Sequence, residues 1–305
     1  MKRNCKYVYD GMGNVIMNIV KISDGLGNQM FQYAFARKLQ IETGKAVYLD
    51  TRFINNEDVT ARGEQTCRDK KNADRKYGLA HFRIRLPQAG ESELKPWSYL
   101  TEDDAISQSV YRLAQTGLWP WQYRDEETSD VKKRAFLPTY YKGYFFDLSY
   151  FDSIKDVLQR DFVLKEKICL PRELSRVLRN EDTISIHVRR GDFLKLNRDI
   201  SQKEYYPKAL AYMSEVVSHP TYLVFSDDIE WVREHLEISG EKIYVSEMGF
   251  RDYEEMAIMR HCKHHIIANS TFSYWPAYLN ANPDKVVVCP KNWKTDIIPK
   301  QWIRI

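Results

Sequence analysis

The sequence lacks long apolar runs and a leader-like start. No stretch approaches the roughly 18 to 20 consecutive apolar residues that a membrane-spanning helix requires. The first residues also lack the basic-then-apolar order of a secretory signal peptide. With 305 residues, 43% of them hydrophobic, and both charge signs well represented, the composition is that of a globular protein with room for two domains. We therefore expect a cytoplasmic protein.

Paired cysteines and a strong charge imbalance are also missing. The five cysteines are an odd number without paired spacing, which is typical of reduced thiols, so we expect no disulfide framework. The formal net charge of +4 is too small to indicate a nucleic-acid-binding protein. Basic residues gather between Arg62 and Lys76, which fits a solvated segment and also fits a peripheral contact with an anionic membrane at the inner face.

Metal and dinucleotide motifs are incomplete. The histidines and cysteine within His261–His265 are crowded together without the spacing of a tetrahedral zinc site. Asp227-Asp228 lacks the Asp-x-Asp spacing of metal-dependent sugar transferases. In the loop Gly25-Leu26-Gly27-Asn28, Met30 occupies the place of the third glycine of the dinucleotide fingerprint. We expect no metal and no nicotinamide cofactor.

The first half begins with a βαβ pattern. Alternation predicts a strand at Ile19–Ile22, helical spacing then predicts a helix that ends at Gly44, and Ala46–Leu49 follows as the next strand. A right-handed crossover places the glycine loop at the carboxyl edge of a parallel sheet, where ligands usually bind. Aromatic residues are frequent between Trp97 and Tyr144, and they fit sugar stacking and core packing equally well.

The second half alternates strands and helices. The expected strands are Thr183–Val188, Thr221–Phe225, Ile243–Val245, His264–Ala268 and Lys285–Val288. This alternation predicts a parallel sheet covered on both faces, and hence an α/β fold class. We divide the chain into an N-terminal extension at residues 1–16, a Rossmann-like domain at 17–175 and a second Rossmann-like domain at 176–305.

Polar side chains follow three of these strands. The segments His187–Asp192, Ser226–Asp228 and Asn269–Thr271 each begin where a strand ends. In a parallel sheet they would share the carboxyl edge, so they can converge on one ligand although they are far apart in the sequence. The last two segments also precede helices, so capping of those helices explains them as well as ligand binding does.

Arg189 and Arg190 are the leading candidates within the first segment. Two adjacent arginines just past a buried strand supply positive charge and forked donors that suit phosphate oxygens. An ion pair with Asp192 is the purely structural alternative. His187 shares a strand face with Ser185, so a buried histidine bonded to the backbone competes with a role at the ligand.

Four segments occur along the chain in a specific order and spacing: Gly25–Tyr33, His187–Asp192, Phe225–Asp228 and Ile267–Ser273. Together they resemble the α1,2-fucosyltransferases of glycosyltransferase family 11, and the similarity covers residues 17 to about 293. The resemblance implies a GT-B architecture with two Rossmann-like parallel-sheet domains. It also implies that GDP-fucose binds mainly to the second domain, that the acceptor approaches from the first, and that no metal is required.

The resemblance also implies roles for individual residues. Arg189 would contact the β-phosphate, Asp227 and Asp228 would contact guanosine, and Asn28 would lie near the reacting sugar. With the strand-end pattern, the donor-binding set is Arg190, Ser226, Asp227, Asp228, Asn269, Ser270, Thr271, Phe272 and Ser273, and the N-terminal loop set is Gly25, Gly27, Asn28 and Gln29. The chain departs from many relatives at Tyr274-Trp275-Pro276, where they carry Trp-Trp-Gly, and in its first sixteen residues.

The predicted reaction is inverting transfer of L-fucose from GDP-fucose to the 2-hydroxyl of a terminal galactose on an acceptor of the lactose type or on a surface oligosaccharide. Arg189, Asp192 and His187 are the candidate catalytic residues. Asp192 is the nearest carboxylate that could accept the proton of the acceptor hydroxyl, with Asp199 and Glu204 as competitors. The alternatives are a noncatalytic module that binds glycans or nucleotides, and a fucosyltransferase of another linkage or acceptor class.

Overall fold

The described residues form two units, each with its own parallel sheet. The computed structural model describes residues 17–54, 76–100, 104–132, 137–180, 182–201 and 204–305, so the extension at 1–16 and most of the basic stretch Arg62–Lys76 lie outside the described residues. The first unit holds the described residues up to Ala80 together with Ile84–Val157, and the second holds His81–Arg83 and Leu158–Ile305. The domain division between residues 175 and 176 stays a prediction.

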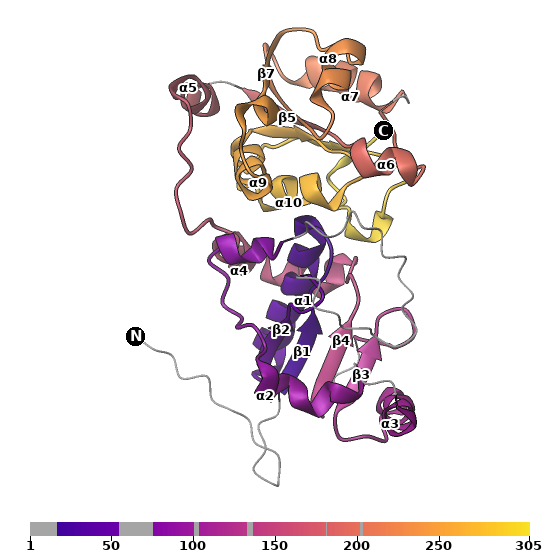
Figure 1. Ribbon diagram of the computed structural model, residues 1–305. Helices are drawn as coiled ribbons and strands as arrows, with labels where there is room; N and C mark the ends of the chain where they lie inside the picture. The colour runs from indigo at the N-terminus through magenta and orange to yellow at the C-terminus, as the bar shows by residue number, and fades with distance from the viewer. Residues whose placement is uncertain (1–16, 55–75, 101–103, 133–136, 181, 202–203) are drawn as a thin grey trace. The chain divides into compact units, whose positions relative to one another are not determined.

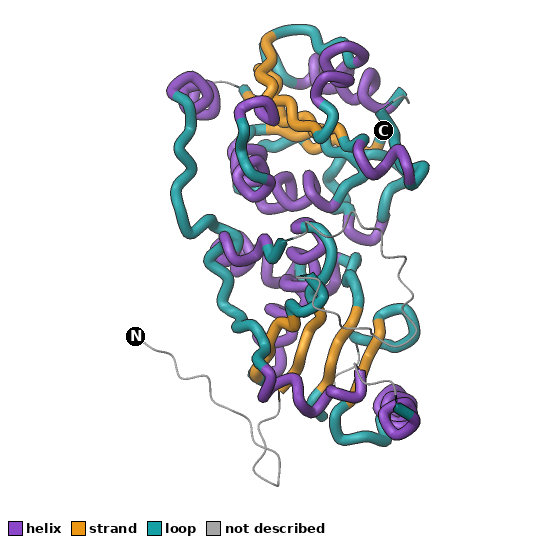
Figure 2. The backbone as a smooth tube through the Cα atoms, viewed as in Figure 1, coloured by secondary structure: helices purple, strands orange, loops and turns teal. Residues whose placement is uncertain are grey.

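A four-stranded parallel sheet forms the centre of the first unit. In spatial order its strands are β2 (Ala46–Asp50), β1 (Met17–Lys21), β4 (Thr139–Lys142) and β3 (Gln122–Asp125). The helices of this unit are α1 (Leu26–Thr43), α2 (Glu91–Leu94) and α3 (Ala105–Thr116). Figure 2 shows the four strands side by side. Because all of them run in the same direction, the loops after β1, β3 and β4 leave the sheet at one edge.

The βαβ pattern predicted for the first half is confirmed. α1 follows the glycine loop directly, and its first turns are inside the unit, since the side chains of Met30, Phe31 and Ala34 are buried. Gly44 ends the helix in a left-handed conformation (φ +67°), and its N–H bonds to the Gln40 carbonyl at 2.9 Å. A glycine adopts this conformation without strain, which is why the helix ends there.

The second unit contains a six-stranded sheet in which all neighbouring strands are parallel. In spatial order its strands are β10 (Ile303–Arg304), β9 (Val287–Cys289), β8 (His264–Ile266), β5 (Thr183–Val188), β6 (Thr221–Ser226) and β7 (Glu241–Tyr244). α4 (Lys155–Asp161) begins in the first unit and ends in the second. The other helices of the second unit are α5 (Arg172–Asn180), α6 (Gly191–Lys195), α7 (Tyr205–Val216), α8 (Ile229–His235), α9 (Asp252–His261) and α10 (Thr271–Leu279).

Helices cover both faces of this second sheet. Tyr206 and Met213 of α7 pack with Ile184 and Ile186 of β5 on one face. On the other face α5 and α9 pack against Leu223 and Phe225 of β6. Figure 1 shows α7 on the opposite side of the strands from α9. The predicted α/β fold class with parallel sheets is confirmed. In the part of the chain that the structure describes, no helix is both long and apolar enough to cross a bilayer.

Candidate active site

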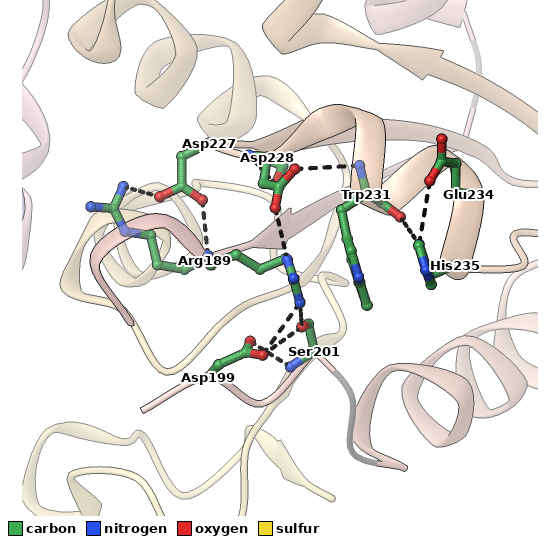
Figure 3. A network of polar contacts seen from close by, with 10 residues as sticks. Arg189, Asp199, Ser201, Asp227, Asp228, Trp231, Glu234 and His235 are labelled. Atoms are coloured by element: carbon green, nitrogen blue, oxygen red, sulfur yellow. Dashed lines mark hydrogen bonds and ion pairs between the residues drawn. The ribbon is translucent and has the colours of Figure 1, made fainter. Parts of the chain in front are cut away.

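The Arg189 guanidinium stands at the end of β5 between two carboxylates. Its Nε and Nη2 donate to Asp192 Oδ1 at 3.0 and 2.7 Å. Nη1 lies 2.9 Å from Asp227 Oδ2, and Figure 3 shows this ion pair. The ion pair with Asp192, the structural alternative for this arginine, is therefore present. About a third of the Arg189 side chain (32%) is nevertheless exposed, so an anion can reach the guanidinium by competing with the two carboxylates. The two pairs hold the side chain in one orientation.

The neighbouring Arg190 is buried, and its bonds connect separate segments of the second unit. Its Nε donates to Asp228 Oδ2 at 2.9 Å, and its Nη1 donates to Asp199 Oδ2 at 3.3 Å and to Ser201 Oγ. The guanidinium also lies over the Trp231 ring, 3.7 Å from the centroid. Arg190 thus ties together the ends of β5 and β6 and the loop after α6. Its direct contact with a donor substrate stays a prediction.

Asp227 is the point where the two strand ends meet. Its Oδ1 accepts a hydrogen bond from the backbone N–H of Arg190 at 2.8 Å, while Oδ2 pairs with Arg189. A Cβ at position 191 would lie 2.5 Å from Asp227 Oδ2. A larger residue at position 191 would therefore require the Asp227 carboxylate to move.

Asp228 caps α8, and Ser226 supports the turn that leads into this helix. Asp228 Oδ1 accepts from the Trp231 N–H at the start of α8, at 3.3 Å. Ser226 Oγ accepts from the Asp228 N–H at 3.0 Å, and the Ser226 N–H donates to Ser246 Oγ. Helix capping was one of the two roles considered for this segment, and Asp228 caps α8. Contacts of Asp227 and Asp228 with guanosine stay predictions.

His187 is a buried, neutral side chain at the same edge. Burial, and secondarily the charge of Arg189, lowers its pKa to about 3, so the imidazole is uncharged at neutral pH. Its ring lies 5.3 Å from the Phe272 ring. Among the described residues, no group bonds to the buried His187 Nδ1. His187 therefore has an unpaired Nδ1 among the described residues, and it cannot offer a positive charge.

The segment after β8 has a second buried atom of this kind. Asn269 Nδ2 donates to the Arg198 carbonyl at 2.8 Å, but the buried Asn269 Oδ1 has no partner within the described ranges. Ser270 caps α10 through the Phe272 N–H, and the Ser273 hydroxyl accepts from the Ala268 N–H. Since β5 and β8 are neighbours in the sheet, His187 and Asn269 belong to one edge. Buried polar atoms without a partner are rare and require an explanation.

The three candidate bases are all associated with cations. Asp192 pairs with Arg189 and Asp199 with Arg190. Glu204 is largely exposed and pairs with Lys208, which lowers the pKa of its carboxyl. Asp192 and Asp199 belong to the arginine network, whereas Glu204 pairs along α7. The geometry alone selects none of them as the base.

The residues considered for zinc have structural partners. His265 Nδ1 bonds to Ser185 Oγ at 2.8 Å and its Nε2 to Asn280 at 3.0 Å, while His264 Nδ1 accepts from the Val286 N–H. Cys262 is buried and its thiol lies 3.7 Å from the Ile258 carbonyl. Over the described ranges, no three histidine, cysteine or acidic residues are grouped so that they could hold a metal.

The glycine loop of the first unit is held by Gln29. Its Nε2 donates to the carbonyls of Asp24 and Lys76 at 2.8 and 3.0 Å, and its Oε1 accepts from the Gly78 N–H at 3.0 Å. The side chain is fully buried, so Gln29 positions the loop. The Gly25 carbonyl accepts from the Asn28 N–H at 2.9 Å. Contacts of Gly25, Gly27, Asn28 and Gln29 with an acceptor or donor sugar stay predictions.

Glu255 on α9 was missed by the sequence analysis. Burial is the main cause that raises the pKa of this carboxyl to about 7, with Asp252 and Asp227 as further causes and a hydrogen bond with Ser246 opposing them. Ser246 also binds the N–H of Ser226, so Glu255 is connected to the end of β6. Glu255 is three residues before the buried Ile258. Residues at this spacing lie on one face of a helix, so the sequence could have indicated that Glu255 faces the interior.

The raised pKa predicts a pH-dependent stability. Between pH 4.5 and 7 the folded chain keeps a proton on Glu255 that the unfolded chain has lost, so stability falls as pH rises through this window. We expect Glu255→Gln to match the wild type near pH 5 and to exceed it at pH 8 by about 2 to 3 kcal/mol. Urea unfolding at both pH values measures this, with the exposed Glu234→Gln as control. An equal difference at both pH values would contradict the prediction.

A family model and several relatives match the chain. The model of glycosyl transferase family 11 matches residues 105–303. The chain is 28% identical to the O-antigen biosynthesis glycosyltransferase WbnK of Escherichia coli, over 93% of this chain and 99% of that protein. It is 27% identical to an α1,2-colitosyltransferase of Escherichia coli, over 94% and 98%. A galactoside α1,2-fucosyltransferase 1 of Ateles belzebuth is 24% identical over 65% of this chain and 53% of that protein.

The fold also resembles a solved structure. A mutant of Arabidopsis thaliana FUT1 in complex with GDP superposes with a TM-score of 0.53 and 12% identity, over 96% of this chain and 77% of that one. At this identity the likeness concerns the fold alone. It agrees with the predicted GT-B class of two parallel-sheet Rossmann-like domains.

Proposed function

The chain belongs to glycosyl transferase family 11 and is a glycosyltransferase, and we propose that it moves L-fucose from GDP-fucose to the 2-hydroxyl of a terminal galactose. Two relatives that match it over nearly their whole length carry names of glycosyltransferases, one of them an α1,2-transferase. Other relatives are named galactoside α1,2-fucosyltransferases. These names support the linkage and the acceptor sugar.

The observation that carries the proposal is the polar edge of the second sheet. Arg189, partly exposed, lies at the same edge as two buried atoms without partners among the described residues, His187 Nδ1 and Asn269 Oδ1. A nucleotide diphosphate-sugar offers negative charge for the exposed part of the guanidinium, while the two buried atoms are polar groups that the described residues leave without a partner. The residues present therefore fit the donor.

The proposed reaction is a single displacement. The acceptor oxygen forms a bond to C1 of fucose while the bond from C1 to the diphosphate oxygen breaks, so the anomeric configuration inverts. Arg189 stabilises the negative charge that develops on the departing GDP. The hydroxyl proton passes to a base, for which Asp192, Asp199 and Glu204 are the candidates. In this proposal Arg189 supplies positive charge to the diphosphate, and no metal takes part.

Two finer points belong to the proposal. The acceptor is a galactose-terminated surface oligosaccharide, supported by the O-antigen biosynthesis name of a full-length relative. The site of action is the cytoplasm, with peripheral contact at the inner face of the membrane. Free thiols at Cys169, Cys262 and Cys289 fit a reducing compartment.

Colitose is the second candidate sugar, because one full-length relative is named an α1,2-colitosyltransferase. A donor comparison decides between the two. Purified protein is incubated with lactose and, separately, with GDP-fucose, GDP-colitose or UDP-galactose, with and without EDTA. We expect GDP release and a trisaccharide from GDP-fucose, unchanged by EDTA. Transfer from the UDP-sugar alone would overturn the proposal, and binding without turnover would favour a noncatalytic module.

A further inference from the structure

A second cluster of side chains lies at the carboxyl edge of the first unit's sheet. β1 and β4 are neighbours in this sheet, and the loops that follow them carry Asp24 and Tyr144. The Tyr144 hydroxyl donates to Asp24 Oδ2 at 2.7 Å. Gln32 of α1 joins the same loops, because its Nε2 bonds to Ser23 Oγ and to the Gly143 carbonyl. The cluster borders the glycine loop that the sequence singled out.

Tyr144 presents an aromatic ring to solvent. With 39% of its surface exposed, it is the most exposed aromatic residue in the described ranges, whereas Tyr140 and Tyr141 just before it are buried. Its ring stacks on Phe146 at 5.2 Å with an interplanar angle of 3°. Glu126 Oε2 accepts from the Tyr144 N–H at 2.8 Å. The ring is thus held in place by Phe146 and through its backbone, while part of its surface remains accessible to a ligand.

Asp24 has a backbone conformation that favours glycine. Its φ is +66°, in the left-handed region that residues with a Cβ rarely adopt. The bond from Gln29 to the Asp24 carbonyl and the bond from Tyr144 to its carboxylate hold the residue there. Glycine would take this conformation without strain, so the backbone conformation itself does not require a side chain at this position. Strained residues of this kind cluster at functional sites.

We propose that Tyr144 and Asp24 form the subsite for the acceptor galactose. The exposed ring covers the apolar face of the pyranose, and the Asp24 carboxylate accepts a hydrogen bond from one of its hydroxyls. An uncharged sugar with one apolar face and several hydroxyls matches an accessible ring beside a carboxylate. The inference rests on the proposed function, because that function supplies a galactose acceptor.

Two variants separate recognition from folding. Asp24→Gly removes the carboxylate and relieves the backbone conformation, so the variant should fold at least as well as the wild type. Tyr144→Ala removes the ring. For each we expect the KM for lactose to rise about tenfold or more, equivalent to about 1.4 kcal/mol, with little change in the KM for GDP-fucose. Leu137→Ala is the control, since Leu137 is equally exposed (40%) but precedes β4 at the opposite edge.

A binding measurement makes the test independent of turnover. Saturation-transfer NMR with methyl β-galactoside should show the sugar on the wild type and on Leu137→Ala, and weakened transfer on Asp24→Gly and Tyr144→Ala. If the wild type transfers fucose but the variants keep the wild-type lactose KM and NMR signal, the subsite is wrong and the proposed function stands. If the wild type transfers no fucose, the proposed function fails. The NMR comparison then still tests the subsite. Signals that are equal in the wild type and the three variants, or absent from all four, would contradict it.

Discussion

Replacing Arg189 by alanine is expected to lower kcat with GDP-fucose by about a hundredfold or more, because preorganised charge at a developing anion lowers a barrier by about 3 to 4 kcal/mol. The side chain is oriented by Asp192 and Asp227 and is exposed enough to meet the diphosphate. Initial rates of GDP release at saturating donor and acceptor measure the effect. Arg189→Lys should recover only part of the rate, since an ammonium lacks the fork of the guanidinium.

A matched arginine distinguishes this role from a general loss of positive charge. Arg233 lies on α8 of the same unit, half exposed and paired with Glu247, so Arg233→Ala should keep the wild-type rate. The melting temperature of Arg189→Ala shows whether the variant remains folded. A folded Arg189→Ala protein with wild-type turnover would remove Arg189 from the mechanism.

The second large effect concerns stability. Arg190→Ala is expected to lower the free energy of unfolding by about 2 to 3 kcal/mol, because it removes a buried cation from two carboxylates that are themselves only partly exposed (11% and 35%). Asp199 and Asp228 lose their partner, and Trp231 loses the guanidinium stacked on it. Urea unfolding of both proteins gives the difference.

The same measurement on Arg233→Ala provides the comparison for an exposed arginine, which should cost less than about 1 kcal/mol. Arg190→Met, which keeps the stem but not the charge, should remain close to Arg190→Ala if the ion pairs dominate. A loss of stability for Arg190→Ala no larger than that for Arg233→Ala would show that the buried network contributes little.

The sequence predicted the sheet edge well because its signals are local. Alternation of apolar residues located the strand at Thr183–Val188, which the structure reproduces as β5, and parallel geometry alone brings the strand ends together. The short helix α6 was not predicted, because five residues are too few for a periodic pattern. The loop was instead interpreted as one continuous polar segment.

The different exposure of the two arginine side chains could not be predicted from the residues next to them in the sequence. Arg189 and Arg190 are chemically identical and adjacent, yet one is partly exposed and the other is enclosed by Asp199, Asp228 and Trp231. These partners come from distant parts of the chain, so tertiary contacts decide the outcome. The positive φ of Asp24 could not be predicted from the sequence for the same reason, since Gln29 and Tyr144 hold this residue through tertiary hydrogen bonds.

The structure of the product tests the central claim most directly. The protein is incubated with GDP-fucose and lactose, and NMR of the isolated trisaccharide determines the linkage and the anomeric configuration. We predict that C1 of fucose is joined to O2 of galactose with a configuration opposite to that of the donor. A product with another linkage or with retained configuration, or no product from GDP-fucose, would contradict inverting α1,2-fucosyl transfer.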